Sequence, residues 1–585
     1  MKELMNPIEK ANFIEKEYRE YLKYTFSFKD EDYKEQFIRE LDAQTLYKGP
    51  YLNVSLPFKT TKSIDELMDE GKISRLFEKM GKVKFEQKLY YHQEVAFDKI
   101  SSGRNVVITT GTGSGKTESF LYPIINSILQ DIERNDNPLG IRAIFLYPMN
   151  ALVNDQIDRV REMLGSFPEI RFGFFTGDTP ETETKNLREE LAKDNESYIP
   201  INEVLSREDM RNNPPHLLFT NYSMLEYLLI RPNDFKIFKK EYLKKWRFIV
   251  MDEAHTYNGT LGIEISYLLK RLTGLSEKKP QFILTSATLG EKNRDEKDIV
   301  NFAETLTSAP FAYDDIIFSV RRELNHNEIR YQVSPEFYIN IENNLEDVEK
   351  IKQLLGKYID VSNTDVKELL YDFLKKDSNV YYLYDLLKKE SLQFKEVMAL
   401  LISNGFSNND ELVALIHLIN IARKNFQGIY DIKYHTFIRT LAGAYVTVCN
   451  PKKLKLSLTY DIDALKAFEL GTCRYCNASF IFGKEMDGFL RQNDDIDIYE
   501  NYGDNEAIIM DYYYLPYDEE FDKENCEEYI LCGKCGRIYN KSNKNAIKCD
   551  CADEYKISVY KVESSKRNNI NRCPSCLHQS KKWDS

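Results

Sequence analysis

The chain has 585 residues, a formal net charge of −13 and ten cysteines. This length is enough for about three or four domains, each with its own core. No apolar run is long enough to span a bilayer and the charged start lacks the apolar segment of a secretory signal, so a membrane protein is excluded and a cytoplasmic protein is predicted. The acidic balance argues against broad binding of nucleic acid, but not against a local binding cleft.

Residues 1–80 predict a helical N-terminal leader. Its segments carry many charges and are interrupted at Lys48-Gly49-Pro50 and at Leu56-Pro57. Two interpretations stay open. The segment is either a specific leader to the domain that follows or a solvated helical cap with no role in chemistry.

Residues 81–310 predict an α/β domain. Strand and helix patterns alternate here, which indicates a parallel sheet with helices on both faces. In such a sheet, ligands bind at the carboxyl ends of the strands.

A glycine-rich loop follows the apolar run 105–109 and precedes an amphipathic helix. Its backbone N–H groups are expected to point at phosphate oxygens, and the helix N-terminus adds a positive dipole end. Lys116 is expected to hold the β- and γ-phosphates of ATP, and Thr117 the Mg²⁺. The predicted ATP-binding residues are Thr110, Gly111, Thr112, Gly113, Ser114, Gly115, Lys116 and Thr117.

A pair of carboxylates follows the apolar run 248–251, as a Mg-nucleotide site requires. Asp252 is expected to bind Mg²⁺, and Glu253 to orient or deprotonate the water that attacks the γ-phosphate. His255 is expected to couple this site to the next strand, which ends in Ser286, Ala287 and Thr288. The predicted catalytic residues are Lys116, Asp252, Glu253 and His255.

These motifs, in this order, resemble those of the superfamily 2 DEAD/DEAH-type helicases. The phrases at 147–156 (YPMNALVNDQ) and 220–232 (TNYSMLEYLLIRP) are most similar to the bacterial branch with Lhr-like, mitomycin-repair and phage-defence helicases. The resemblance covers about residues 40–310 and implies one RecA-like motor lobe. By analogy it implies unwinding or translocation on DNA, usually 3′ to 5′, while RNA stays open as a substrate.

The resemblance also implies roles for individual residues. Gln93, in the run Leu89-Tyr90-Tyr91-His92-Gln93, is the expected adenine-reading residue. The expected nucleic-acid contacts lie in three further motifs, and they are Pro148, Asn150, Gln156, Thr176, Gly177, Asp178, Thr220 and Asn221.

Residues 311–440 predict a mainly helical connector, because apolar residues recur at helical spacing from about 345 to 430. The remaining residues, 441–585, predict a small cysteine-rich zinc-binding module. Within that module the acidic, tyrosine-rich segment 487–529 indicates a loop or a surface that faces a partner.

Eight cysteines form four close pairs, which have the spacing of metal-binding knuckles. In a cytosolic chain this pattern favours zinc over disulfides, and two structural Zn²⁺ ions are expected. The predicted ligands are Cys473, Cys476, Cys532, Cys535, Cys549, Cys551, Cys573 and Cys576. The simplest pairing joins the first pair with the second and the third with the fourth, and a crossed arrangement stays open.

A superfamily 2 motor also needs a second RecA-like lobe with arginine fingers, and no segment after Thr288 has its motif pattern. Arg321-Arg322 comes too early for it. The favoured explanation is the first half of a split helicase, in DNA repair or phage defence, whose second lobe is another polypeptide. The alternative is a zinc-stabilised ATP-binding adaptor or regulatory subunit without unwinding activity.

Overall fold

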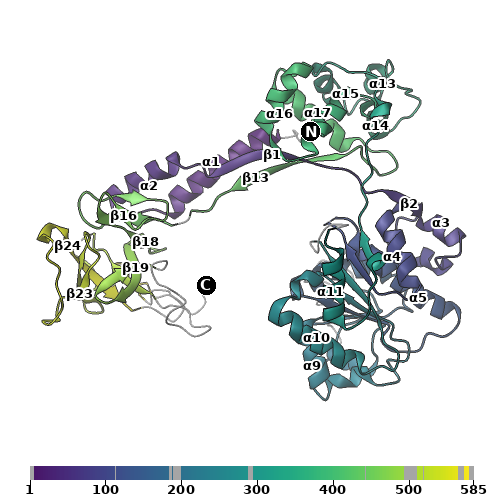
Figure 1. Cartoon of the computed structure of the whole chain (residues 1–585), viewed down its shortest axis with the longest axis horizontal. Coiled ribbons are helices and arrows are strands. Elements are labelled where there is room, and N and C mark those ends of the chain that lie inside the picture. Colours follow the sequence, from purple (N-terminus) through teal and green to yellow (C-terminus); the bar gives the residue numbers. More distant parts are fainter. Residues whose placement is uncertain are drawn as a thin grey trace.

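The structure is a computed structural model that describes residues 6–111, 113–183, 188, 199–287, 294–441, 443–492, 510–517, 520–563 and 572–578. Thr112 and Thr288, two of the predicted site residues, lie outside these ranges. Figure 1 shows an α/β domain, a helical domain and a cysteine-rich module, and a long two-stranded ribbon that runs from the helical domain to that module.

The α/β domain is built on an eight-stranded sheet in the order β11-β4-β10-β9-β5-β8-β6-β7. Every neighbouring pair in this sheet is parallel. The strands are β4 (Val106–Thr109), β5 (Ala143–Tyr147), β6 (Phe172–Phe175), β7 (Glu203–Val204), β8 (Leu217–Asn221), β9 (Phe248–Met251), β10 (Gln281–Ser286) and β11 (Ile316–Phe318). The predicted α/β, RecA-like fold with its parallel sheet is confirmed.

Helices cover both faces of this sheet, because successive strand residues point to opposite sides. Val106 and Phe145 lie in the core of one face, whereas Val107 and Ile144 lie in the core of the other. The helices of this domain are α3 (Ile64–Asp69), α4 (Tyr91–Ser101), α5 (Lys116–Glu133), α6 (Asn150–Leu164), α8 (Arg207–Asn212), α9 (Tyr222–Ile230), α10 (Gly259–Thr273) and α11 (Glu296–Thr307). A two-stranded ladder of β2 (Thr60–Ser63) and β3 (Lys88–Tyr90) precedes α4.

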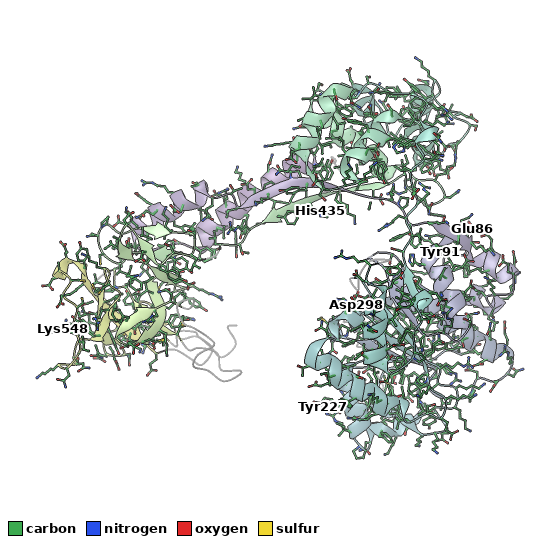
Figure 2. The ribbon with its side chains drawn as sticks, in the orientation of Figure 1. Glu86, Tyr91, Tyr227, Asp298, His435 and Lys548 are labelled. Carbon is green, nitrogen blue, oxygen red and sulfur yellow. The ribbon has the colours of Figure 1, made fainter. Side chains whose placement is uncertain are left out.

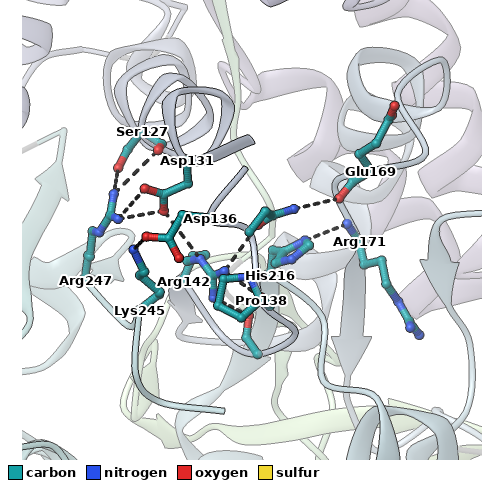
Figure 3. Close-up of polar contacts among 12 residues, drawn as sticks. Ser127, Asp131, Asp136, Pro138, Arg142, Glu169, Arg171, His216, Lys245 and Arg247 are labelled. Carbon is teal, nitrogen blue, oxygen red and sulfur yellow. Dashed lines mark hydrogen bonds and ion pairs between the residues drawn. The ribbon is translucent and has the colours of Figure 1, made fainter. Parts of the chain in front are cut away.

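A polar network ties the amino-terminal edge of the sheet together (Figure 3). Arg142, which precedes β5, is 1% exposed and donates to the carbonyl of Gly140 at 3.0 Å. Arg247, which precedes β9, donates to both carboxylate oxygens of the buried Asp131 on α5, at 2.8 and 2.6 Å. Burial lowers the pKa of Arg142 to about 10. Charges at this edge are therefore paired inside the fold, and the opposite, carboxyl edge holds the predicted site.

The helical domain packs around a second apolar core that includes Leu370, Leu383 and Leu415, each with no exposed surface. Its helices are α12 (Glu336–Glu342), α13 (Val348–Leu355), α14 (Val366–Leu374), α15 (Ser378–Leu387), α16 (Phe394–Leu401) and α17 (Asn409–Ile421). Asn408 caps α17, because its side chain accepts from the N–H of Glu411. A three-stranded antiparallel sheet lies against this core, with β1 (Tyr47–Ser55) between β12 (Leu392–Gln393) and β13 (Asp431–Ile438).

The stability of the helical domain is expected to fall between about pH 4 and pH 6. Asp377 is fully buried, and burial raises the pKa of Asp377 to about 6 although Tyr338 donates to its carboxylate. Because the pKa of this carboxyl is higher in the folded state, the folded domain is favoured at low pH, where the carboxyl is protonated. The free energy of unfolding falls by about 3 kcal/mol as the carboxyl ionises. Hydrogen exchange of residues 366–387, corrected for the intrinsic effect of pH, measures this loss. Asp377→Asn should remove the pH dependence, and an unchanged profile in that variant would contradict the assignment.

The cysteine-rich module contains a nine-stranded antiparallel sheet in the order β15-β14-β18-β19-β21-β24-β22-β23, with β20 paired to β19. Its strands are β14 (Tyr445–Val446), β15 (Leu454–Lys455), β18 (Phe468–Thr472), β19 (Ser479–Met486), β20 (Phe489–Arg491), β21 (Asp511–Tyr514), β22 (Glu527–Cys532), β23 (Ile538–Asn540) and β24 (Lys556–Val562). A separate hairpin joins β16 (Asp461–Ile462) to β17 (Leu465–Lys466).

Short 3₁₀ helices complete the described elements. They are η1 (Arg75–Lys79), η2 (Asp234–Phe238), η3 (Ala254–Thr256), η4 (Tyr313–Asp315), η5 (His326–Glu328), η6 (Ile402–Asn404) and η8 (Asp553–Tyr555). No helix in the described ranges combines the length and apolar character that crossing a membrane requires.

The predicted helical leader, residues 1–80, differs from what the structure shows. Helices α1 (Pro7–Thr25) and α2 (Glu31–Ala43) pack on the cysteine-rich module, where Phe37 and Leu41 share a core with Val446. The next segment is strand β1, which pairs with β13, and α3 belongs to the core of the α/β domain. The leader is thus divided among three parts of the molecule through contacts with residues far away in the sequence.

The prediction of a loop across residues 487–529 is wrong where strands β20, β21 and β22 lie, whereas residues 515–517 and 520–526 belong to no helix or strand. Tyr513 and Tyr514 lie in strand β21, inside the nine-stranded sheet, and are 0% and 1% exposed. Their rings fill the core, since Tyr513 stacks edge-on against Tyr529 at 5.6 Å between ring centroids. Aromatic side chains suit a pleated, half-buried surface, and here that tendency outweighs the acidic composition. Residues 493–509 lie outside the described ranges.

Candidate nucleotide and nucleic-acid site

The glycine-rich loop joins β4 to α5 at the carboxyl edge of the sheet. Gly113 and Gly115 have φ angles of 72° and 70°, a left-handed conformation that a side chain disfavours. A Cβ on Gly115 would also lie 2.3 Å from the side-chain nitrogen of Gln93. Ser114 donates to the Thr110 hydroxyl at 2.7 Å and closes the turn. The backbone N–H groups of the loop are therefore accessible to the oxygens of a phosphate group.

Gln93 and His92 hold this loop from the side of α4. Gln93 donates to the Gly115 carbonyl at 3.1 Å and accepts from the Tyr90 N–H at 2.9 Å. His92, which is fully buried, lies with Nε2 2.8 Å from the Ser114 carbonyl oxygen, and burial lowers the pKa of His92. Sequence reasoning singled out Gln93 but missed His92. The sequence did contain a signal for His92, because this histidine ends an apolar run directly before Gln93.

Lys116, the first residue of α5, forms an ion pair with Glu253, with 2.8 Å between Nζ and Oε1. Glu253 follows β9 and has a φ of 46°, a left-handed conformation that is rare for a residue with a side chain. Asp252 accepts from the Thr285 hydroxyl on β10, and burial raises the pKa of Asp252. The loop after β4 and the two carboxylates after β9 therefore form one site, and Thr285 on β10 contacts it.

His255 joins this site to the end of β10. Its Nδ1 lies 2.9 Å from the Ser286 hydroxyl and 3.3 Å from Oε2 of Glu253. Ser286 in turn accepts the N–H of Thr110 through its carbonyl, at 3.1 Å. Ala287 follows Ser286 at the end of the strand. His255 thus lies between Glu253 and the end of β10.

Most of the expected nucleic-acid contacts lie along the other half of the same sheet edge. Pro148 and Asn150 follow β5, Thr220 and Asn221 end β8, and Thr176, Gly177 and Asp178 follow β6. Because β5, β8 and β6 are adjacent, these residues form one continuous row. Asn221 donates to the Asn150 side chain at 2.5 Å, and Arg207 donates to the carbonyls of Thr176 and Gly177 at 2.9 and 3.2 Å.

Gln156 lies beside the nucleotide loop instead. Its side-chain oxygen is 3.4 Å from the hydroxyl of Thr117, the expected Mg²⁺ ligand. Arg159, one helical turn along α6, donates to the same hydroxyl at 2.9 Å and pairs with Glu118 at 3.1 Å. Sequence reasoning missed Arg159, because its partner on α5 is far away in the sequence.

The donor set fits Mg-ATP. The backbone at Gly111 and Gly113 is open. A cationic amine, a hydroxyl and a half-buried carboxylate are supplied by Lys116, Thr117 and Asp252. Phosphate oxygens bind N–H groups and the amine, and Mg²⁺ prefers hydroxyl and carboxylate oxygens. Glu253 is the remaining carboxylate of the site, and it pairs with Lys116.

The eight predicted cysteine ligands form two groups of four. Cys473, Cys476, Cys573 and Cys576 make up one group, and Cys532, Cys535, Cys549 and Cys551 the other. In each group, all Sγ atoms lie within 4.8 Å of one another. In the first group two Sγ–Sγ distances are 3.8 and 3.7 Å. Four thiolates in tetrahedral contact with zinc would lie about 3.8 Å apart. Both groups therefore fit a closed, structural zinc site.

The simplest pairing of the knuckles is wrong, because the first cysteine pair meets the fourth and the second meets the third. Strands β21 and β24 separate the β18–β19 turn, with Cys473, from the β22–β23 turn, with Cys532. Cys532 pairs in register with Lys556, so the chain that carries Cys549 and Cys551 runs beside the β22–β23 turn. The Cys573 knuckle follows β24 and reaches the first turn. Sheet order, not order in the sequence, decides which thiolates meet.

Comparisons with known proteins agree with this site. A sequence model of the DEAD/DEAH box helicase family matches residues 90–296, and one of the YjiV N-terminal domain matches residues 463–584. The Druantia protein DruE of Escherichia coli is 27% identical over 78% of this chain and 32% of its own length. The ATP-dependent helicase YprA of Bacillus subtilis is 29% identical over 44% of this chain and 28% of its own. The DNA-bound structure of the DUF1998 helicase MrfA, at 21% identity, covers 61% of this chain and 44% of that one with a TM-score of 0.33.

The match to the DEAD/DEAH box helicase family lies in the α/β domain, and it spans the loop, the carboxylates and β10. The relatives include ATP-dependent helicases, among them Lhr-Core of Methanothermobacter thermautotrophicus, and a Druantia protein. The chain spans about a third or less of the length of these first relatives.

Proposed function

We propose that this chain is the first motor lobe of an ATP-dependent DNA helicase or translocase that acts in DNA repair or phage defence. Mg-ATP binds between the glycine-rich loop and Asp252, with Gln93 beside the base and Glu253 beside the γ-phosphate. The observation that carries this proposal is the convergence of Lys116, Asp252 and Glu253 at one sheet edge, inside the segment that matches the helicase family.

A nucleic-acid strand lies across the ends of β5, β8 and β6 in this proposal. Asn150, Thr176 and Asn221 are in that row, and backbone groups at strand ends suit contacts to phosphate and sugar. DNA is proposed over RNA because the phrases at 147–156 and 220–232 resemble those of a helicase branch that acts on DNA. His255 and Ser286 couple the state of the nucleotide to this row through β10.

The second RecA-like lobe comes from another polypeptide in this proposal. Among the described residues, the sheet that contains β4 is the only parallel one. A transition state with charge on the γ-phosphoryl group needs arginine fingers from a second lobe, and their loss lowers turnover by about 10³ to 10⁵.

Addition of the second lobe is therefore expected to raise ATP turnover by about 10³ to 10⁵ in the presence of single-stranded DNA. The chain is mixed with a polypeptide that carries a second RecA-like helicase lobe, and phosphate release is measured. A matched second lobe whose finger arginines are changed to alanine is the control and should give no increase. Rapid DNA-stimulated turnover by the chain alone would contradict the need for a second lobe. ATP binding with no turnover under any of these conditions would favour the adaptor.

A further inference from the structure

One face of the ribbon of β1 and β13 is open and carries basic side chains, although the chain as a whole is acidic. Residues paired across the two strands lie on the same face. The pairs are Asn53 with Lys433, Tyr51 with His435 and Lys48 with Phe437. Arg439 follows on the same side, because side chains alternate along a strand. We call these seven residues the arm face.

The opposite face of the ribbon is partly used by the fold. Leu52 and Ile432 lie in the core of the helical domain, and Tyr434 packs against it. On the arm face, in contrast, Lys433, His435, Phe437 and Arg439 are exposed. Figure 2 labels His435 on the part of the ribbon that runs between the helical domain and the cysteine-rich module.

Aromatic and cationic groups lie beside one another on the arm face. The ring of Phe437 is 59% exposed and meets Tyr51 edge-on, with 5.9 Å between ring centroids. Lys48, Lys433 and Arg439 form no ion pair within the described ranges. The one carboxylate of β13 on this side, Asp431, is paired with Arg423 at 2.5 Å. The arm face is thus locally positive, although the whole chain carries −13.

We infer that the arm face binds a single strand of nucleic acid, as an accessory site outside the motor domain. Exposed rings accept unpaired bases by stacking, and lysines beside them neutralise phosphates. From residue 433 to residue 439 the strand extends about 20 Å, so the face contacts several nucleotides. This inference rests on the proposed function, because it assigns a second contact to the same strand.

The test is the affinity of the full chain for fluorescent oligothymidine and oligouridine, measured by anisotropy across a range of salt concentrations. Phe437→Ala is expected to weaken binding by about 5- to 150-fold, the range that one base–aromatic stack supports. Phe437→Trp should restore it. Lys433→Gln should reduce the slope of log affinity against log salt by about 0.7. The two oligonucleotides show whether the face prefers DNA or RNA.

Two matched variants serve as controls. Ile438→Ala removes an exposed apolar side chain from the opposite face of the ribbon, and Lys357→Gln removes an exposed lysine from the helical domain. Both should bind as the unchanged chain does. If the unchanged chain binds the oligonucleotides, and Phe437→Ala and Lys433→Gln bind them equally well, the inference is overturned and the proposed function stands. No binding of either oligonucleotide by the unchanged chain would overturn both.

Discussion

Glu253→Gln is expected to lower ATP turnover of the assembled motor by about 10²- to 10⁴-fold, which is the contribution of a positioned base. Glutamine keeps the shape of the side chain but does not take a proton from water. Asp252 is held separately by Thr285, so the metal ligand stays in place and ATP remains bound. Phosphate release in a single turnover measures hydrolysis, and retention of nucleotide on a filter measures ATP binding. Together the two assays separate loss of hydrolysis from loss of binding.

Asp252→Asn is the matched control, because it neutralises the neighbouring carboxylate and should weaken Mg-dependent binding of ATP. The assignment of Glu253 fails if its glutamine variant turns over ATP at the unchanged rate. It also fails if that variant loses ATP binding to the same extent as Asp252→Asn does.

Serine at all four of Cys532, Cys535, Cys549 and Cys551 is expected to lower bound zinc from two ions per chain to one. These four thiolates form one complete group, so the other site keeps its ligands. Serine at Cys473, Cys476, Cys532 and Cys535 should instead remove both ions, because it takes two ligands from each group. A structural zinc site stabilises its domain by about 10–16 kcal/mol, so each lost ion is expected to unfold the knuckles around it.

Elemental analysis of the purified chain gives the number of ions, and hydrogen exchange at β22 and β23 gives the local stability. Cys526→Ser, outside both groups, should keep two ions. The opposite pattern, with no zinc in the first variant and one ion in the second, would show that the knuckles pair in sequence order.

The nucleotide site could be predicted from the sequence because its parts are local. A short apolar strand, a glycine-rich turn and a helix N-terminus lie within a few residues of one another, and each fixes the geometry of the next. The two carboxylates follow a second strand whose apolar run is equally plain. Parallel strands bring their carboxyl ends to one edge, so the sequence alone predicted that Lys116 and Glu253 would lie close together.

The contacts that join distant segments could not be predicted in this way. Strand β1 pairs with β13, and α1 and α2 pack on strands that come after residue 440. Apolar periodicity shows which face of an element is buried, but not against what. The same limit applies to the cysteines, whose spacing indicates zinc but whose grouping depends on the order of strands in the sheet.

Binding of Mg-ATP to the purified chain, measured by titration calorimetry beside Lys116→Ala, tests the central claim most directly. The amine of Lys116 lies at the N-terminus of α5, 2.8 Å from Glu253, where it would meet the β- and γ-phosphates. Saturable binding at one site by the unchanged chain, with affinity lost in Lys116→Ala, is the predicted result. No binding by the unchanged chain, or equal affinity for the two proteins, would contradict the claim that this sheet edge is the ATP site of a motor lobe.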